Sequence, residues 1–176
     1  MRVGVELIAT RPWDVLTMMD IAAAADVSKP LLYHYFSTKR DLYIAAVRSA
    51  AGQLRRATRP DATLRDEQQL HRALEAHVDW IEANALGYRT VLQGGVSGDP
   101  DVRAIVEQSR SEVVDRIVQT LALGRPPAVV RIALRGWVGF LEGACLDWLG
   151  SRDIPKPELV RLLAASLPAV IAAADA

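Results

Sequence analysis

A short stretch near the N-terminus gathers side chains that donate hydrogen bonds. Ser28 and Lys29 are followed closely by Tyr33, His34 and Tyr35. Hydroxyl, imidazole and ammonium groups are donors that proteins direct at phosphate oxygens. Because the whole chain has 21 basic and 21 acidic residues, no overall charge attracts it to a nucleic acid. Any such attraction must come from a local surface of this kind.

Two short helices joined by a tight turn are expected to position these donors. Thr17 can cap a helix over residues 18–25, and Ser28 can cap a second helix over residues 29–35. Pro30 lies in the first turn of the second helix, where its missing N–H costs no hydrogen bond. Two helices in this arrangement form a helix-turn-helix. The alternative is that the aromatic residues belong to the core of a helical bundle, and the residues by themselves leave both interpretations open.

The composition indicates a globular protein of a reducing compartment. Hydrophobic residues make up 51% of the 176, enough for a core, and a single cysteine, Cys145, excludes an internal disulfide. Glu6, Arg11 and Asp14 interrupt the N-terminal segment, so we expect no signal peptide. No run of about 18 apolar residues occurs, and we therefore expect no transmembrane helix, no membrane partner and a cytoplasmic location.

No residue pattern indicates catalysis, a metal or a cofactor. The chain lacks the HExxH, paired-cysteine, glycine-rich phosphate-loop and GxSxG patterns. His71 and His77 are six residues apart and do not share a helical face. Glu142 and Cys145 can meet on one helix, but no histidine accompanies them in the sequence. We therefore expect no catalytic residue, no metal ligand and no cofactor, and an enzyme is the least favoured class.

The sequence as a whole predicts an all-α protein. Alanine, leucine, arginine and glutamate are abundant, and the alternation typical of strands is absent. Glycine and proline clusters divide the chain into helical segments. The predicted helices cover residues 2–10, 18–25, 29–35, 39–57, 66–84, 87–93, 101–122, 127–149 and 157–174.

The stretch TMMDIAAAADVSKPLLYHYFSTKRDLY, residues 17–43, resembles the helix-turn-helix signature of the TetR/AcrR family of transcriptional repressors. The shared pattern is a capping threonine, Ile-Ala with small residues, Val-Ser-Lys, Leu-Tyr-His-Tyr-Phe, and then lysine and leucine. The resemblance implies a three-helix DNA-binding head over residues 1–48 and a helical ligand-binding and dimerisation domain over residues 49–176. It also implies a homodimeric repressor that a small effector releases from a palindromic double-stranded operator.

The resemblance assigns DNA-binding roles to nine residues. Some are implied to contact phosphates, and the others are implied to enter the major groove and meet base edges. The phosphate contacts are Thr17, Tyr33, His34 or Tyr35, and Lys39, and the groove residues are Ser28, Lys29, Pro30 and Leu31.

Two departures from the family pattern fall inside this stretch. Asp26 replaces a glycine before Val-Ser, and aspartate also tolerates turn geometry. Pro30 and Leu31 replace the commoner Gly-Thr. Base readout would then depend on apolar contact, for example with a thymine methyl, unless Leu31 lies in the core.

A third departure lies before it. Pro12 and Trp13 replace the family's Gly-Tyr or Gly-Phe. The first helix is expected to begin almost at Met1, about one turn short of the family pattern, without the basic arm that usually precedes it. Residues 1–60 contain nine basic and five acidic side chains, a mildly positive lobe that suits a modest electrostatic footprint on DNA.

The C-terminal part is expected to form an apolar effector pocket. Helices over residues 66–84, 101–122 and 127–149 each carry an apolar stripe that can be buried around a common axis. Such a site suits a hydrophobic molecule with one or two hydrogen-bonding atoms and no strong charge. The alternatives are that His77 is a core histidine and that the glycines only permit close helix packing. The residues expected to line the pocket are His77, Trp80, Tyr88, Ser109, Trp137, Phe140 and Gly143.

The last two predicted helices are implied by the resemblance to form a four-helix dimer interface. A two-fold dimer is what a helix-turn-helix needs in order to address a palindromic operator. The alternative class is a ligand carrier or protein-interaction module whose helix-turn-helix no longer binds DNA, since the first helix is expected to be truncated. The effector, the operator and the target genes are not written in the sequence.

Overall fold

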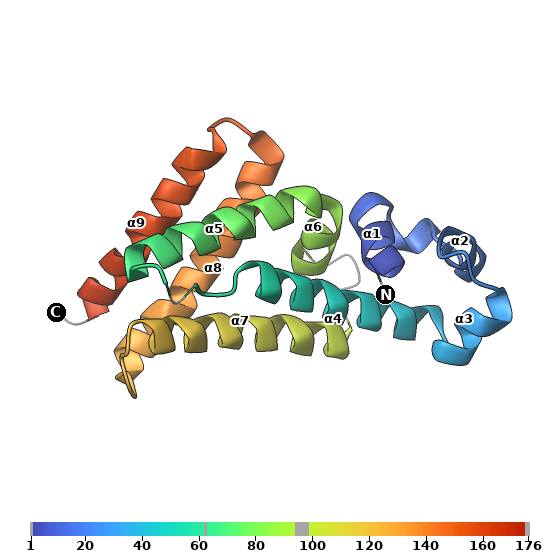
Figure 1. Cartoon of the computed structure of the whole chain (residues 1–176), viewed down its shortest axis with the longest axis horizontal. Coiled ribbons are helices and arrows are strands. Elements are labelled where there is room, and N and C mark those ends of the chain that lie inside the picture. The colour runs from blue at the N-terminus through green and yellow to red at the C-terminus, as the bar shows by residue number, and fades with distance from the viewer. Residues whose placement is uncertain (1, 62, 94–98, 175–176) are drawn as a thin grey trace. The chain divides into compact units, whose positions relative to one another are not determined.

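The computed structural model describes residues 2–61, 63–93 and 99–174, and within these ranges the chain is helical without any strand (Figure 1). The all-α prediction is confirmed, and each predicted helix boundary lies within two residues of the observed one. A 3-10 turn at residues 13–15 has no counterpart among the predicted helices. The elements are α1 (Arg2–Thr10), η1 (Trp13–Val15), α2 (Met18–Ala24), α3 (Lys29–Tyr35), α4 (Lys39–Ala57), α5 (Asp66–Ala83), α6 (Ala85–Gln93), α7 (Pro100–Thr120), α8 (Ala128–Ser151) and α9 (Lys156–Ala174).

The chain divides into two compact units that do not follow the order of the sequence. The first unit consists of Met1–Leu54 and Ala83–Val106, and the second of Arg55–Glu82 and Glu107–Ala176. In the first unit α1 packs against α2 and α6, and α2 packs against α3. In the second unit α8 packs against α9. This partition differs from the predicted division after residue 48, because α6 packs against α1, and Val102 and Ile105 of α7 belong to the core of the first unit.

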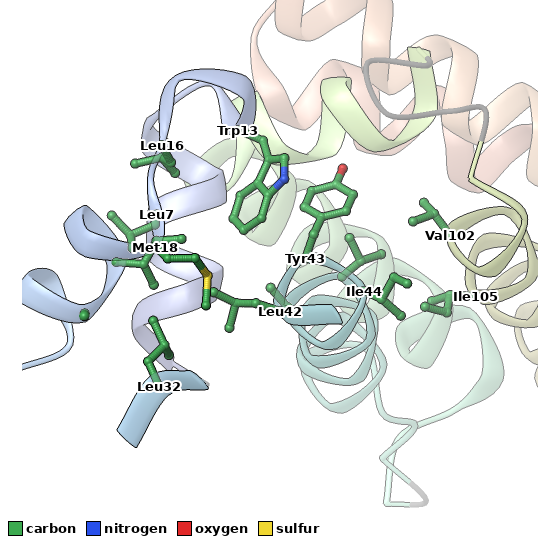
Figure 2. Packing of buried hydrophobic residues seen from close by; sticks show 14 residues of the cluster. Leu7, Trp13, Leu16, Met18, Leu32, Leu42, Tyr43, Ile44, Val102 and Ile105 are labelled. Carbon is green, nitrogen blue, oxygen red and sulfur yellow. The ribbon is translucent and has the colours of Figure 1, made fainter. Parts of the chain in front are cut away.

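One hydrophobic core holds the first unit together (Figure 2). Its buried side chains come from α1, η1, α2, α3, α4 and α7, and helix α3 contributes only Leu32. Val27 and Phe36, on either side of α3, pack against this core. The described core residues are Leu7, Trp13, Leu16, Met18, Ile21, Ala22, Leu32, Leu42, Tyr43, Ile44, Ala46, Val47, Val102 and Ile105.

Three helices of the first unit begin at a hydroxyl side chain. Thr17 and Asp20 form a capping box at α2, in which each residue's side chain bonds the other's backbone N–H. Thr38 and Asp41 make the same pair of bonds before α4, at 3.0 Å each. The hydroxyl of Ser28 accepts a hydrogen bond from the first turn of α3. The predicted caps at Thr17 and Ser28 are thereby confirmed.

The turn between α2 and α3 depends on a left-handed residue. Asp26 has φ of +52°, and its N–H donates to the carbonyl of Ala23 at 3.2 Å. The N–H of Val27 donates to the carbonyl of Ala22 at 3.0 Å. These two bonds are those of a Schellman motif, whose left-handed position usually holds glycine but accepts a short polar residue. The aspartate at the family's glycine position therefore keeps the turn.

The second unit is built around α8. Trp137 is 3% exposed, and its indole N–H donates to the hydroxyl of Ser166 on α9 at 2.9 Å. Trp148 donates to the carbonyl of Ile154 at 2.8 Å and so fixes the connection between the two helices. Figure 1 shows α8 and α9 lying beside each other. The buried residues of α8 are Val130, Leu134, Trp137, Val138, Leu141, Cys145, Trp148 and Leu149, which include most of the predicted apolar seam.

Helix α9 is long and apolar enough to cross a membrane by length and composition alone, with a mean hydropathy of 1.5. No transmembrane helix is expected from the sequence, because no run of about 18 apolar residues occurs in it. Only 22% of this stretch is buried within the chain. Leu159, Val160, Leu163 and Leu167 form its buried side, so most of an apolar helix is left on the surface.

Candidate functional site

Helix α3 exposes nearly all of its side chains. Within Lys29–Tyr35 the single buried residue is Leu32, so the predicted groove and phosphate residues of this helix all lie on the surface. Leu31 is 43% exposed and therefore does not belong to the core. Tyr33 is 42% exposed and Tyr35 is 71% exposed, which is unusual for large aromatic residues. The exposed residues are Lys29, Pro30, Leu31, Tyr33, His34 and Tyr35.

The aromatic side chains of α3 are arranged by neighbouring contacts. The ammonium of Lys29 lies 5.8 Å from the centroid of the Tyr33 ring, one turn further along the helix. The rings of His34 and Tyr35 pack edge to face with centroids 5.3 Å apart. All four side chains are exposed, and their N–H and O–H groups can donate to phosphate oxygens.

The hydroxyl of Thr17 is already engaged within the chain. It donates to the carboxylate of Asp20 at 2.6 Å and accepts from the backbone N–H of the same residue at 3.1 Å. Hydrogen bonds from the Thr17 side chain, and then from its backbone, lower the pKa of Asp20. A phosphate contact by this hydroxyl would therefore have to replace a bond to a carboxylate. The bond of Ser28 is different, because its oxygen accepts from Leu31 N–H at 3.3 Å and its own O–H is still a donor.

Lys39, at the start of α4, is held by the 3-10 turn η1. Its ammonium donates to the carbonyl of Asp14 at 3.3 Å and lies 5.2 Å from the centroid of the Trp13 ring. The same indole packs against Tyr43 with centroids 4.9 Å apart (Figure 2). The sequence predicts Lys39 as a phosphate contact but not this support. The sequence feature that could have indicated this support is Trp13, which stands where the family pattern has tyrosine or phenylalanine.

The neighbouring Arg40 is paired within the first unit. Its guanidinium bonds both carboxylate oxygens of Asp99, at 2.6 and 2.9 Å, and one oxygen of Asp101 at 2.7 Å. Hydrogen bonding from Arg40 lowers the pKa of Asp99, whose side chain is only 8% exposed. Of the two basic residues that begin α4, Lys39 is thus the one whose described contacts involve no carboxylate.

The residues predicted to line an effector pocket fall into different environments. Tyr88 belongs to the first unit and is buried, and the other six belong to the second unit. Trp80 and Ser109 are partly buried. Trp137 is buried and bonded to Ser166. His77 is partly exposed as a residue, but its Nε2 atom is buried, and burial lowers the pKa of its imidazole to about 4.

Phe140 and Gly143 lie on the exposed side of α8. Phe140 is 43% exposed, and an added Cβ on Gly143 would meet nothing within 4 Å. Gly136 and Gly139 have the same open surroundings. This placement favours an interface over a closed pocket for these residues. Helical periodicity identifies this face of α8, but both faces of the helix are apolar, and the sequence does not indicate which one is buried.

Cys145 and Glu142, which can meet on one helix, do not form a nucleophilic site. Cys145 is fully buried, and burial, followed by the nearby Glu142, raises the pKa of its thiol to about 12. A thiol in this state is a poor nucleophile. Glu142 instead forms a two-bond ion pair with Arg110 of α7, at 2.7 and 2.9 Å. Among the described residues no group of three or more His, Cys, Asp or Glu side chains is placed to hold a metal ion.

Both parts of the chain match known protein families. Residues 1–46 match bacterial regulatory proteins of the tetR family, and residues 66–170 match the tetracyclin repressor-like C-terminal domain. The HTH-type transcriptional activator FasR of Mycolicibacterium smegmatis is 32% identical over 162 residues, which cover 88% of this chain and 73% of FasR.

Solved structures share the fold. A tetR-family transcriptional regulator from Streptomyces coelicolor has a TM-score of 0.91 at 29% identity, covering 98% of this chain and 78% of that chain. FadR from Bacillus subtilis, solved in complex with stearoyl-CoA, has a TM-score of 0.68 at 16% identity, covering 97% of this chain and 95% of that chain. At the lower identity the likeness concerns the fold alone.

We expect acid to destabilise the folded protein through His77. The unfolded chain protonates this imidazole near its ordinary pKa of 6.5, whereas the folded chain does so only near pH 4. The stabilisation by the neutral imidazole is therefore complete above pH 6.5 and is lost as the pH falls toward 4. Between pH 7.5 and pH 5 the free energy of unfolding should fall by about 2 kcal/mol on this account. Chemical denaturation of wild type and His77→Gln at both pH values measures the difference.

His71 on the same helix provides the matched control, because its side chain is 50% exposed. Between pH 7.5 and pH 5, the free energy of unfolding of His71→Gln should fall as much as that of the wild type. For His77→Gln the fall should be smaller by about 2 kcal/mol. If the two variants respond alike, the imidazole of His77 is not the buried neutral group described above.

Proposed function

Because this chain belongs to the tetR family of bacterial regulatory proteins, we propose that helix α3 and the start of α4 bind a palindromic operator. The protein is a ligand-responsive DNA-binding transcriptional regulator and not an enzyme. In the proposed complex α3 enters the major groove with Ser28, Lys29, Pro30 and Leu31. Tyr33, Lys39 and one of the rings at 34 and 35 contact phosphates. DNA is in the cytoplasm of a bacterial cell, and we place the protein there.

The observation that carries this proposal is the exposure of α3. Helix α3 has six exposed side chains and one buried one, so it contributes little to the hydrophobic core of the first unit. Its surface residues therefore serve another purpose. The exposed Leu31 suits apolar contact with a thymine methyl, and Tyr33 and Lys29 present hydrogen-bond donors beside it. A surface of mixed donors and apolar groups fits a base-reading helix.

The alternative of a helix-turn-helix that no longer binds DNA is less well supported. A decayed head has no need to keep the geometry that positions α3. Yet Thr17 and Ser28 cap their helices, and Asp26 keeps the left-handed turn between them. These features support a functional DNA-binding head.

We further infer that the exposed side of α8 and α9 pairs with a second copy of the chain. Glycines in α8 each cost about 1 kcal/mol of helix stability relative to alanine. Within one chain nothing occupies the space at Gly136, Gly139 and Gly143. A second copy packed closely against these positions explains why they lack side chains. Ile132 is 63% exposed, Phe140 43% and Leu162 of α9 49%, and they add apolar surface to the same two helices.

The proposed effector is a hydrophobic molecule bound by the second unit. His77 is neutral at physiological pH, since its pKa is about 4, and it suits hydrogen bonding to an uncharged group. Trp80 and Ser109 are partly buried on α5 and α7 of the same unit. The fold is shared with FadR, which was solved with stearoyl-CoA. A long-chain acyl thioester is therefore the first class to test, with its acyl chain as the part recognised.

The proposed direction of regulation is repression, relieved by the effector. Effector release requires that the ligand bind more tightly to a conformation that fits the operator poorly. The second candidate is activation, which the naming of FasR as a transcriptional activator favours. Transcription in vitro from a promoter that carries the operator distinguishes the two by whether added protein lowers or raises transcript.

Replacing Lys39 should weaken binding to DNA of any sequence. Lys39→Met keeps the apolar stem but removes one phosphate contact, and we expect about a tenfold loss of affinity. The slope of log K against log salt should fall by about one. Tyr33→Phe, which removes one neutral donor, should cost several-fold without a change in slope. Fluorescence anisotropy with a labelled random-sequence duplex measures both quantities at low salt.

The control is Arg48→Met, the same loss of charge at an exposed position of α4 outside the proposed contacts. It should leave the salt slope unchanged. A Lys39→Met protein with wild-type affinity and slope would remove Lys39 from the interface.

Placing a large charged residue on the exposed face of α8 should separate the dimer. Gly139→Arg finds open space in the single chain and replaces a poor helix former, so folding should be preserved. Two buried arginines facing each other in the dimer would be strongly unfavourable. We expect a monomer by sedimentation and a loss of operator binding of at least 100-fold, because each half-site is then bound alone.

Ser111→Arg adds the same residue at an exposed position of α7 and should remain dimeric. The proposed interface is refuted by a Gly139→Arg protein with the mass and operator affinity of the wild-type dimer.

Stearoyl-CoA should release the protein from its operator, and coenzyme A alone should not. Three of the four tryptophans lie in the second unit, so binding should also change the intrinsic fluorescence. His77→Ala removes one hydrogen-bonding group and should raise the dissociation constant of the ligand about 3- to 10-fold. His71→Ala, at an exposed position of the same helix, should bind as the wild type does. Unchanged fluorescence and DNA binding with stearoyl-CoA would reject the acyl class, and unchanged affinity in His77→Ala would place the ligand elsewhere.

A further inference from the structure

The indole of Trp13 lies against two residues of α4. Lys39 and Tyr43 are four residues apart and so share a face of that helix. The Tyr43 ring packs on the indole at a centroid distance of 4.9 Å, and the Lys39 ammonium lies 5.2 Å from the indole centroid (Figure 2 shows the two rings). Trp13 is 8% exposed and Tyr43 is 2% exposed. The indole is thus a buried ring of the core that also contacts the ammonium of Lys39.

The turn η1 adds a second contact to the same ammonium. The carbonyl of Asp14 accepts a hydrogen bond from Lys39 at 3.3 Å. This carbonyl is held in place because the N–H of Leu16 donates to the carbonyl of Trp13 at 3.2 Å, and Pro12, with φ of −58°, fixes the entry to the turn. An ammonium has three N–H donors, and this bond uses one of them. Two donors are left for phosphate oxygens.

A lysine on a surface usually samples many rotamers, and a phosphate contact must order it. The stem of Lys39 is partly buried, and its head is held by an aromatic face and a carbonyl. An aromatic face and a backbone carbonyl attract the ammonium without neutralising its charge, unlike the carboxylates that hold Arg40. Lys39 is therefore ordered before DNA arrives and keeps its full charge.

We propose that Trp13 and the η1 turn are positioning elements for DNA binding, which hold the ammonium of Lys39 at the site where it meets a phosphate. This inference rests on the proposed role of Lys39 as a phosphate contact. The Tyr43 hydroxyl has no hydrogen-bond partner in the described part of the chain, so Tyr43 supports the indole through its ring. Trp13 acts through Lys39 and does not itself touch DNA.

A double-mutant cycle tests the proposal with a labelled random-sequence duplex and fluorescence anisotropy over a range of salt. Trp13→Leu keeps an apolar side chain but removes the aromatic face, and it should weaken binding about 2- to 5-fold. Its salt slope should equal that of the wild type, because the charge of Lys39 is still present. In the Lys39→Met background the same Trp13→Leu change should have no further effect. Trp13→Phe restores an aromatic face with a weaker quadrupole and should bind within about 2-fold of the wild type.

Two results would overturn the inference. One is equal weakening by Trp13→Leu in the Lys39 and Lys39→Met backgrounds, which indicates general damage to the DNA-binding head. The other is wild-type affinity of Trp13→Leu while Lys39→Met is weakened. If Lys39→Met itself changes neither affinity nor slope, the proposed phosphate contact fails, and the positioning role fails with it.

Folding is followed separately by circular dichroism and thermal unfolding. Tyr43→Phe is the matched control within the same cluster, because it removes a hydroxyl without a described partner and keeps the ring. It should bind DNA as the wild type does. If Trp13→Leu does not fold, the cycle is run with Trp13→Met, which also lacks an aromatic face and whose weaker binding must again disappear in the Lys39→Met background.

Discussion

The DNA-binding surface depends on how helix α3 is held, and a single buried leucine of that helix joins it to the core. Helix α3 has seven residues, far fewer than the roughly 12–15 that an isolated helix needs to be marginally stable in water. Its stability therefore comes from Leu32 in the core of the first unit, from Val27 and Phe36 on either side, and from the cap at Ser28. Because so few residues of α3 are needed for this, the others can be chosen for what they bind.

The charged residues of the chain also act through their positions rather than through their number. The chain carries equal numbers of basic and acidic residues, and many of its charged side chains are paired within the unit to which they belong. Arg40 is bound by Asp99 and Asp101, and Arg110 by Glu142. The pairing of Arg40 with Asp99 and Asp101 leaves fewer unpaired positive charges in the first unit, although exposed pairs of this kind add little stability. What remains near α3 is a small number of placed donors rather than a broad basic patch, so position matters more than net charge.

By residue type alone, the exposed side of α8 and α9 is consistent with a membrane span, with the wall of a ligand pocket and with a dimer interface. Alanine, leucine and valine residues make α9 apolar enough to resemble a membrane span, while only part of the helix is buried in one chain. Phe140 and Gly143 are equally consistent, by type, with the wall of a ligand pocket. Their exposure in the folded chain separates these descriptions, because a residue that faces outward from one protomer can line only a surface. The proposed pairing of two chains would account for both the apolar character of α9 and the missing side chains of α8.

The sequence by itself determined the helices, their starts and the turn at Asp26. These features depend on contacts within about five residues, such as the bond from Val27 to Ala22, and such contacts can be read from spacing. Only the tertiary structure decided which face of α8 is buried, which residues hold Lys39, and that Arg40 is paired with two carboxylates. Lys39 meets the carbonyl of Asp14 across 25 residues, and Arg40 meets Asp99 across 59. Periodicity shows that a face is apolar but not what covers it, and it cannot bring distant residues together, because that depends on how the helices pack.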